Sequence, residues 1–392
     1  MRIFNIKYFS LIKILIVLLL LSAFRNLTPS YYLILLGVVF LLSLKLFQTP
    51  IKVSSLHSIF YIFIAYTILI IFWSGLYMQS WLFLPGVPRV LIMPILTLFI
   101  ISVVKTDEQV ITLIRLILFC YVVASFTIIY QIIYGPIPWF ADFFYRAGLD
   151  RYASILGSLT IYGSIVGYGL LLTYSDTNIV KNSLLKIILV VILSAGAFFS
   201  LTKSGIVMIA LSLAIYILFN FNKNHLSVKK ISLFIITITI IIALLITIPE
   251  FKMYYDVVVT QTIGGSSIFS DGSNVLIDSA PINFEHIFKR LFMTPYHMYL
   301  EYGNIALLIG VGLQGAAGTL GVIGPDGHYL SAHNSFGDLI FMGGVLYFLI
   351  FLIMYFMVQF KLFKYRNENK LSLLLFMTNI LFLANLLISG SI

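Results

Sequence analysis

The chain has 392 residues, of which 61% are hydrophobic and only 10% are charged, and its formal net charge is +10 at pH 7. So much apolar surface excludes a soluble globular domain and indicates a polytopic membrane protein. The single cysteine, Cys120, excludes a disulfide framework and a cysteine-ligated metal site. The positive charge is typical of basic loops on the inner side of a membrane, so it does not by itself indicate a nucleic-acid partner.

Apolar segments long enough to cross a bilayer follow one another along the whole chain. A spanning helix needs about 20 predominantly apolar residues. The first segment has the basic flank of a signal peptide but no small-residue cleavage pattern, so we interpret it as a retained span. The pattern predicts an all-α polytopic membrane protein with about 11 or 12 transmembrane helices in one domain over residues 1–392. The candidate spans are residues 8–24, 31–47, 56–73, 88–104, 110–134, 153–174, 184–200, 203–221, 231–249, 334–358 and 371–389.

The Lys and Arg residues predict the orientation of these spans, because cytoplasmic loops are enriched in both. With the N-terminus inside, the inner connections collect most of the basic residues and only four acids, Asp107, Glu108, Asp176 and Glu368. Residues 250–331 then form a large outward loop. The basic residues assigned to the inner side are Arg2, Lys7, Lys13, Lys45, Lys52, Lys105, Arg115, Lys181, Lys186, Lys223, Lys229, Lys230, Lys361, Lys364, Arg366 and Lys370.

The large outward loop contains two features with a pattern of their own. Apolar residues recur at helical spacing over residues 284–292, which predicts a helix lying on the outer membrane surface or packed against the tops of the spans. Residues 299–332 are dense in glycine, and we expect them to be non-helical up to His333 and Asn334, where an apolar run begins. Long loops without periodic structure tend to carry function, so this junction is the predicted chemical site.

Outward basic residues near span ends are candidate anion-binding groups. Arg89, Arg151, Lys203 and Arg290 are the candidates, because burying a cation near a membrane is costly unless an anion pairs with it. A guanidinium also presents a planar fork of donors to phosphate oxygens. The alternative for each is an anchor whose charged end reaches the interface. A lone histidine at the position of His333 would more often be structural. We interpret His333 as a functional residue because of the sequence motif around it, described next.

Several of these segments resemble one family. The sequence HNSFGDLIFMGG at residues 333–344 resembles the H-[NS]-x8-G signature of the O-antigen polymerase and O-antigen ligase superfamily. GVGLQG at residues 310–315 resembles the glycine-rich element that precedes the His-Asn pair. SLTKSGIVMIAL resembles the T-x-S-R-G segment of the family, with Lys203 where arginine is usual. Arg151 and Arg290 resemble the two family arginines of the outward loops.

The resemblance covers roughly residues 145–345 and implies a multi-pass transferase of the bacterial inner membrane with a periplasmic active site. Its substrates would be undecaprenyl-pyrophosphate-linked oligosaccharides, with membrane lipid and a chain-length regulator protein as further partners. His333 would be the catalytic base, while Arg151, Arg290, Arg89, Lys203 and Asn334 would bind substrate. The glycines would let the backbone approach the glycan or the lipid head closely. We expect no metal and no other cofactor, because no D-x-D or other metal-ligand spacing occurs.

Three functions compete. The first is the repeat-unit polymerase of O-antigen or lipopolysaccharide biosynthesis, and the second is the ligase that joins finished polymer to lipid A–core. The sequence separates these two poorly. The third is a polysaccharide flippase or transporter, which would favour charged or broken helices near the midplane and inverted repeats. The charges of this chain gather at the ends of the spans and not near the midplane, and the sequence has no internal repeat.

Overall fold

The structure is a computed structural model of the chain. The predicted span 231–249, the predicted surface helix 284–292, and Arg290, His333 and Asn334 lie outside the residues that it describes. The described residues are 2–28, 30–47, 55–78, 87–140, 144–146, 149–157, 161–175, 177, 179–220, 296, 299–300, 302–313, 321–323, 329–331 and 335–388.

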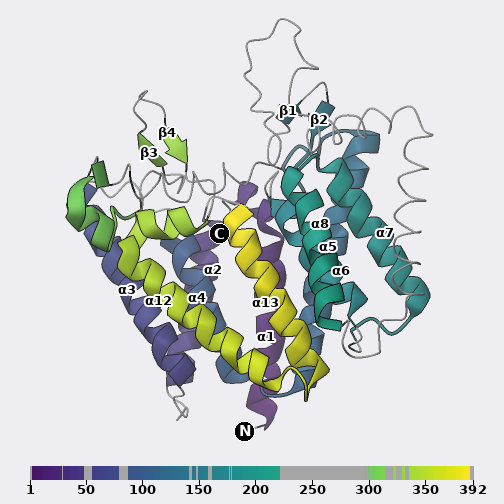
Figure 1. The fold of residues 1–392 in the computed structure, drawn as a ribbon, viewed down its shortest axis with the longest axis horizontal. Coiled ribbons are helices and arrows are strands. Elements are labelled where there is room, and N and C mark those ends of the chain that lie inside the picture. Colours follow the sequence, from purple (N-terminus) through teal and green to yellow (C-terminus); the bar gives the residue numbers. More distant parts are fainter. Residues whose placement is uncertain are drawn as a thin grey trace, which may run out of the picture.

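The protein is an all-α polytopic membrane protein, as the sequence predicts. Four described helices are long and apolar enough to cross a membrane: Ser55–Leu76, Asp107–Tyr134, Ser335–Tyr365 and Lys370–Leu387. The helices run between two ends of the molecule (Figure 1). They are α1 (Arg2–Leu20), the 3-10 helix η1 (Ser22–Asn26), α2 (Tyr31–Phe47), α3 (Ser55–Met78), α4 (Val87–Val103), α5 (Asp107–Tyr134), α6 (Ile161–Tyr174), α7 (Ser183–Phe199), α8 (Lys203–Asn220), α12 (Ser335–Tyr365) and α13 (Lys370–Ile388).

Most predicted spans coincide with these helices to within several residues, although α1 covers residues 2–20 and not 8–24, and two further helices differ in their backbone. Helix α6 begins at Ile161 and not near residue 153, because residues 152–157 run without helix. Helix α12 extends to Tyr365 and is kinked at Gly344, whose φ of +70° and ψ of −172° are not helical. Both differences concern the hydrogen bonding of the backbone, which hydropathy does not report.

Helix α5 begins with a capping box, a reciprocal pair of hydrogen bonds between side chains and backbone. The Thr106 side chain accepts a hydrogen bond from the backbone N–H of Gln109, and the Gln109 side chain accepts one from the backbone N–H of Thr106. This reciprocal cap satisfies two N–H groups that the helix leaves unpaired. Asp107 and Glu108 add negative charge to the first turn, which complements the helix dipole. Gly135, with φ +90°, ends α5.

The helices pack around four apolar clusters of described residues. The largest joins α5, α6, α7, α8 and α13, the second joins α1, α2 and α4 with Leu113 of α5, and the third joins α3 and α12 with Leu386 of α13. The fourth joins α12 to Ala306 and Val311. Large apolar side chains also face outward, among them Leu33, Phe72 and Phe119, which are each more than half exposed. Such an outer surface is suited to lipid and not to water.

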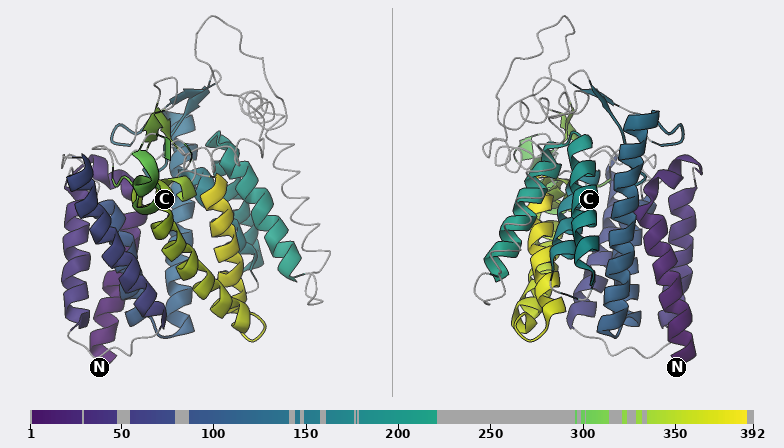
Figure 2. Two further views of the ribbon diagram at one scale, coloured as in Figure 1. Left: turned by 60° about the vertical axis from the view of Figure 1, so that its left-hand side comes forward. Right: turned by 90° about the vertical axis from the view of Figure 1, so that its right-hand side faces the viewer.

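Two short hairpins mark one end of the molecule, which we call the hairpin end (Figure 2). β1 (Phe144–Arg146) pairs antiparallel with β2 (Leu149–Arg151), and β3 (Gly321–Ile323) pairs antiparallel with β4 (Tyr329–Ser331). The N-terminus lies at the opposite end, which we call the amino-terminal end (Figure 1). There the Asn369 side chain donates to Asp107 Oδ2 at 3.0 Å, joining the α12–α13 turn to the start of α5. The connections assigned to opposite sides by their charges therefore lie at opposite ends.

Candidate functional site

Among the predicted site residues, Arg151 is the one whose side chain the structure describes. It is the last residue of β2, opposite Phe144 in the β1–β2 hairpin, and only 7% of its surface is exposed. Its Nε donates a hydrogen bond to the backbone carbonyl of Ser200 at 3.0 Å. The hairpin thereby brings a buried guanidinium onto the connection between α7 and α8.

The α7–α8 connection is tight and polar. The Ser200 and Thr202 hydroxyls are 2.7 Å apart, and Leu201 between them has a φ of +50°, in the left-handed region that favours glycine. Lys203 begins α8 directly after this turn. The first N–H groups of a helix have no intrahelical partner, so the start of α8 adds backbone donors near the Arg151 contact.

Two glycines let α6 pack closely against this turn. A Cβ on Gly163 would lie 2.2 Å from Thr202 Oγ1, and one on Gly205 would lie 2.9 Å from the same atom. Contacts this short are essentially never made by real side chains, so both positions require glycine unless Thr202 moves. The small residues of SLTKSG therefore serve helix packing around Thr202.

The residues after Arg151 form a buried segment that is held by side chains from other elements. Gln131 of α5 donates to the carbonyl of Ala153 at 2.8 Å, and Thr127 Oγ1 accepts from the backbone N–H of Ile155 at 3.1 Å. Arg25 of η1 donates to the carbonyl of Gly157 at 2.7 Å. Buried backbone polar groups need such partners when no helix supplies them. Gln131 is not among the predicted site residues, although its polar amide near the end of an otherwise apolar span marks it in the sequence.

A second non-helical segment enters at the same end, from residue 310 to residue 313, and we call it the glycine junction. The backbone N–H groups of Val311 and Gly312 donate to the carbonyls of Phe341 and Met342, both at 3.0 Å. A Cβ on Gly310 would lie 2.2 Å from the carbonyl oxygen of Met342. The segment thus lies directly on the backbone of α12, next to the kink at Gly344.

Helix α3 fixes the glycine junction from the other side. Trp73 Nε1 donates to the carbonyl of Gly310 at 2.9 Å, and Ser74 Oγ accepts from the backbone N–H of Leu313 at 2.7 Å. A Cβ on Gly312 would lie 2.0 Å from Ser74 Oγ. The expectation that these glycines admit a glycan or lipid head is wrong for Gly310 and Gly312, because α12 and α3 occupy the space beside them. The preceding residues 302–309 are helical, which also differs from the prediction.

The other predicted site residues are placed only in part. Lys203 begins α8 beside the Arg151 contact, and Arg89 lies in the first turn of α4 at the hairpin end, but neither side chain is described. The structure therefore brings Arg151 together with the segment of Lys203. His333, Asn334 and Arg290 lie outside the described residues, so their distance from Arg151 and Lys203 stays a prediction.

No protein-family model matches this chain, and no curated protein matches it either. The resemblance to the polymerase and ligase superfamily therefore rests on the motifs in the sequence. Within the described residues, no three His, Cys, Asp or Glu side chains are grouped so that they could hold a metal ion. The expectation of a metal-free site stays a prediction.

Proposed function

We propose that this protein is a repeat-unit polymerase. It transfers a growing glycan from undecaprenyl pyrophosphate to the non-reducing end of another lipid-linked repeat unit. One observation carries the proposal: the hydrogen bond between Arg151 and Ser200, 49 positions apart. Each residue belongs to a segment that resembles a motif of the superfamily, and a family relationship requires those segments to meet. The glycine junction, which resembles a third motif, enters at the same hairpin end.

The chemistry requires positive charge at the leaving group. Breaking the bond at the anomeric carbon leaves a pyrophosphate, and preorganised cations and helix donors stabilise the negative charge as it develops. Arg151 and Arg290 supply guanidinium groups for this role, with Arg89 and Lys203 as additional cations. The N-terminus of α8 adds backbone N–H groups beside Arg151.

The acceptor sugar must lose a proton as its hydroxyl attacks. His333 takes this proton, because the pKa of an imidazole lies near neutrality. A single displacement inverts the anomeric carbon. Asn334 orients the loop or caps α12, which begins at Ser335.

The proposed setting is the bacterial inner membrane, with the hairpin end in the periplasm. The distribution of Lys and Arg between the two ends supports this orientation. Labelling of a single cysteine introduced at Ser331, the last residue of β4, tests it. Labelling of intact cells is expected, and labelling only after the inner face is opened would reverse the orientation.

A deletion strain separates the polymerase from the ligase. Loss of the polymerase leaves lipopolysaccharide with one repeat unit on its core, whereas loss of the ligase leaves no repeat unit on the core. Loss of a flippase also leaves the core bare, so a second assay uses the purified protein with lipid-linked repeat units. Polymer formed in that assay excludes a transporter, and the absence of polymer contradicts the proposal.

The catalytic base is tested in the same assay. His333→Ala is expected to lower turnover by about two to four orders of magnitude, the usual effect of removing a general base. His225→Ala, in a connection predicted to face the cytoplasm, is the matched control and should leave turnover unchanged. Asn334→Ala should cost less than His333→Ala. Near-normal turnover by His333→Ala protein would end the assignment of His333.

A further inference from the structure

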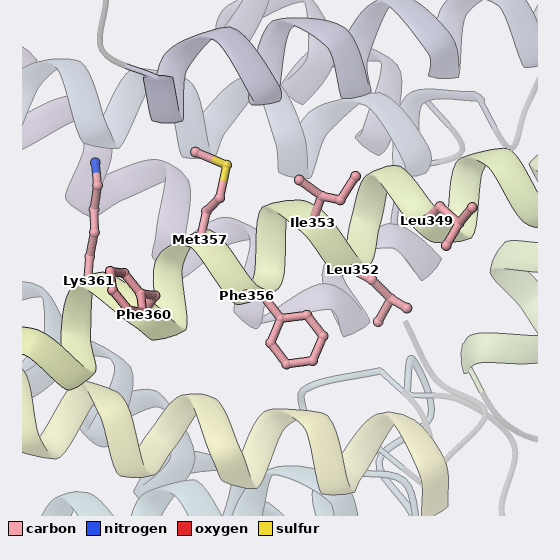
Figure 3. Close-up of a pocket in the computed structure, with 7 residues that line it drawn as sticks. All are labelled: Leu349, Leu352, Ile353, Phe356, Met357, Phe360 and Lys361. Atoms are coloured by element: carbon pink, nitrogen blue, oxygen red, sulfur yellow. The ribbon is translucent and has the colours of Figure 1, made fainter.

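Helix α12 carries an apolar groove along the part that follows the kink at Gly344. The groove is shallow, has a volume of about 490 Å³, and is largely open to the surroundings of the protein. Its lining residues recur every three or four positions, so they form one stripe along the helix. Figure 3 shows them projecting from α12, with Lys361, Met357 and Ile353 on the side away from α13 and Phe356 and Leu352 on the side toward it. They are Leu349, Leu352, Ile353, Phe356, Met357, Phe360 and Lys361.

The described part of the protein leaves this stripe uncovered. Ile353, Phe356 and Phe360 are 51%, 57% and 70% exposed, respectively. Large exposed apolar patches mark sites that contact a membrane or a partner. Because α12 is one of the helices long and apolar enough to span a membrane, acyl chains are the natural contact for the stripe.

One end of the groove is cationic. Among the described residues that line it, Lys361 is the charged one. Lys361 lies four residues before Tyr365, where α12 ends at the amino-terminal end of the molecule (Figure 1). Lys361 and Lys105 are both close enough to His57, near the start of α3, to interact with it electrostatically. His57 therefore has two lysines in its electrostatic surroundings, and Lys361 is the one that lines the groove.

The length of the groove fits one leaflet. From Leu349 to Lys361 the helix advances about 18 Å, at 1.5 Å per residue. Half of the hydrocarbon core of a bilayer is about 15 Å thick. The phosphate of a lipid lies outside the hydrocarbon core, so a lipid with its phosphate at Lys361 has room for one acyl chain along the stripe, ending near the midplane.

We propose that this groove binds one anionic phospholipid from the leaflet at the amino-terminal end. Its phosphate lies at Lys361, and one acyl chain lies along the stripe from Leu349 to Phe360. A zwitterionic lipid would place a second cation beside Lys361, so the groove selects lipids of net negative charge. The site lies at the end of the molecule opposite the proposed active site, so this inference does not depend on the proposed function.

Photochemical labelling of the full-length protein tests the proposal. The protein is reconstituted into phosphatidylcholine nanodiscs that contain traces of phosphatidylglycerol with a photoreactive acyl chain. Adducts are located by mass spectrometry of peptides. Phosphatidylglycerol should label residues 349–360 more strongly than a phosphatidylcholine probe with the same acyl chain. Equal labelling by both probes would overturn the proposal.

Variants of exposed lysines complete the test. Lys361→Gln should reduce labelling by phosphatidylglycerol about fivefold, the effect of one cation near an anionic lipid surface, and Lys361→Arg should retain it. Lys364→Gln is the matched control and should leave labelling unchanged, because Lys364 Nζ lies over the Tyr365 ring and does not line the groove. Unchanged labelling of Lys361→Gln, or cross-links between two copies across α12 in place of lipid adducts, would contradict the proposal.

Discussion

Two non-helical segments enter the bundle at the hairpin end, and they differ in what satisfies most of their backbone groups. The segment after Arg151 is held by polar side chains, including those of Gln131 and Thr127. The glycine junction relies mainly on the absence of side chains, because its backbone bonds directly to the backbone of α12. The first arrangement can be weakened one hydrogen bond at a time. The second is sensitive to a single added methyl group.

The largest effect is expected for Gly310→Ala. The new Cβ would lie 2.2 Å from the Met342 carbonyl oxygen and 2.5 Å from Gly343 N, and the φ of +86° disfavours any L side chain. We expect the free energy of unfolding to fall by more than about 4 kcal/mol, the range of exceptional substitutions, so that little monodisperse protein is recovered from membranes. Size-exclusion chromatography in detergent measures this loss.

Gly303→Ala is the matched control for this substitution. Gly303 has a similar φ of +79°, but nothing lies within 4 Å of its Cβ position. Only the backbone strain remains, which costs about 1 to 2 kcal/mol. Equal recovery of the Gly310→Ala and Gly303→Ala proteins would show that contact with α12 does not determine the need for glycine.

Arg151 probes the segment that is held by polar side chains. Arg151→Ala removes the donor to the Ser200 carbonyl and should lower the free energy of unfolding by about 1 to 3 kcal/mol, measured by the midpoint of thermal unfolding in detergent. Arg151→Lys keeps the charge but loses the planar fork, so under the proposed function it should impair polymer formation. Full-length polymer from Arg151→Lys at a normal protein level would remove Arg151 from the substrate site.

Ser74→Ala tests the one side-chain hydroxyl on which the glycine junction depends. It leaves the buried N–H of Leu313 without its acceptor, at a cost of about 1 to 2 kcal/mol in the free energy of unfolding. Ser102→Ala is the control, because Ser102 Oγ, like Ser74 Oγ, donates to the carbonyl four residues earlier in its helix. Among the described contacts, only Ser74 Oγ of the two also accepts a hydrogen bond from a backbone N–H, that of Leu313. The same thermal midpoint for both variants would mean that Ser74 adds nothing beyond its bond within α3.

The smallest effect is expected for Lys203→Arg. Arginine is usual at this position in the superfamily that the chain resembles, and both side chains carry one positive charge. The thermal midpoint should stay the same, and polymer formation should be retained or increased. A loss of polymer with unchanged protein level would mean that Lys203 does not stand in for the family arginine.

Hydropathy predicted the apolar helices well, because crossing a bilayer imposes one simple requirement on every span. Four of the described helices are long and apolar enough to be spans. Residues 31–47, for example, form α2 with the predicted bounds. The start of α6 could not be predicted in this way. The residues after Arg151 are apolar enough to continue a helix, and the partners that replace the helical hydrogen bonds lie more than twenty positions earlier.

Glycine content was a poorer guide than apolar pattern in residues 299–332. It hid the helix at residues 302–309, whose Ala306 is buried against Val311 and Phe341. It also suggested space for a ligand where Gly310 and Gly312 instead contact protein. Of the candidate site, the sequence predicted the importance of Arg151 but not its partner, because a backbone carbonyl in a distant turn leaves no mark on residue types.

The short turn between α7 and α8 has a consequence for how the protein is made. Only Ser200, Leu201 and Thr202 separate Phe199 from Lys203, so the two helix ends can be at most about 14 Å apart even when the chain is fully extended. Neither helix can be placed in the bilayer and wait at a distance for the other. We therefore expect α7 and α8 to leave the insertion machinery as one helical hairpin, which makes this pair a single unit of biogenesis.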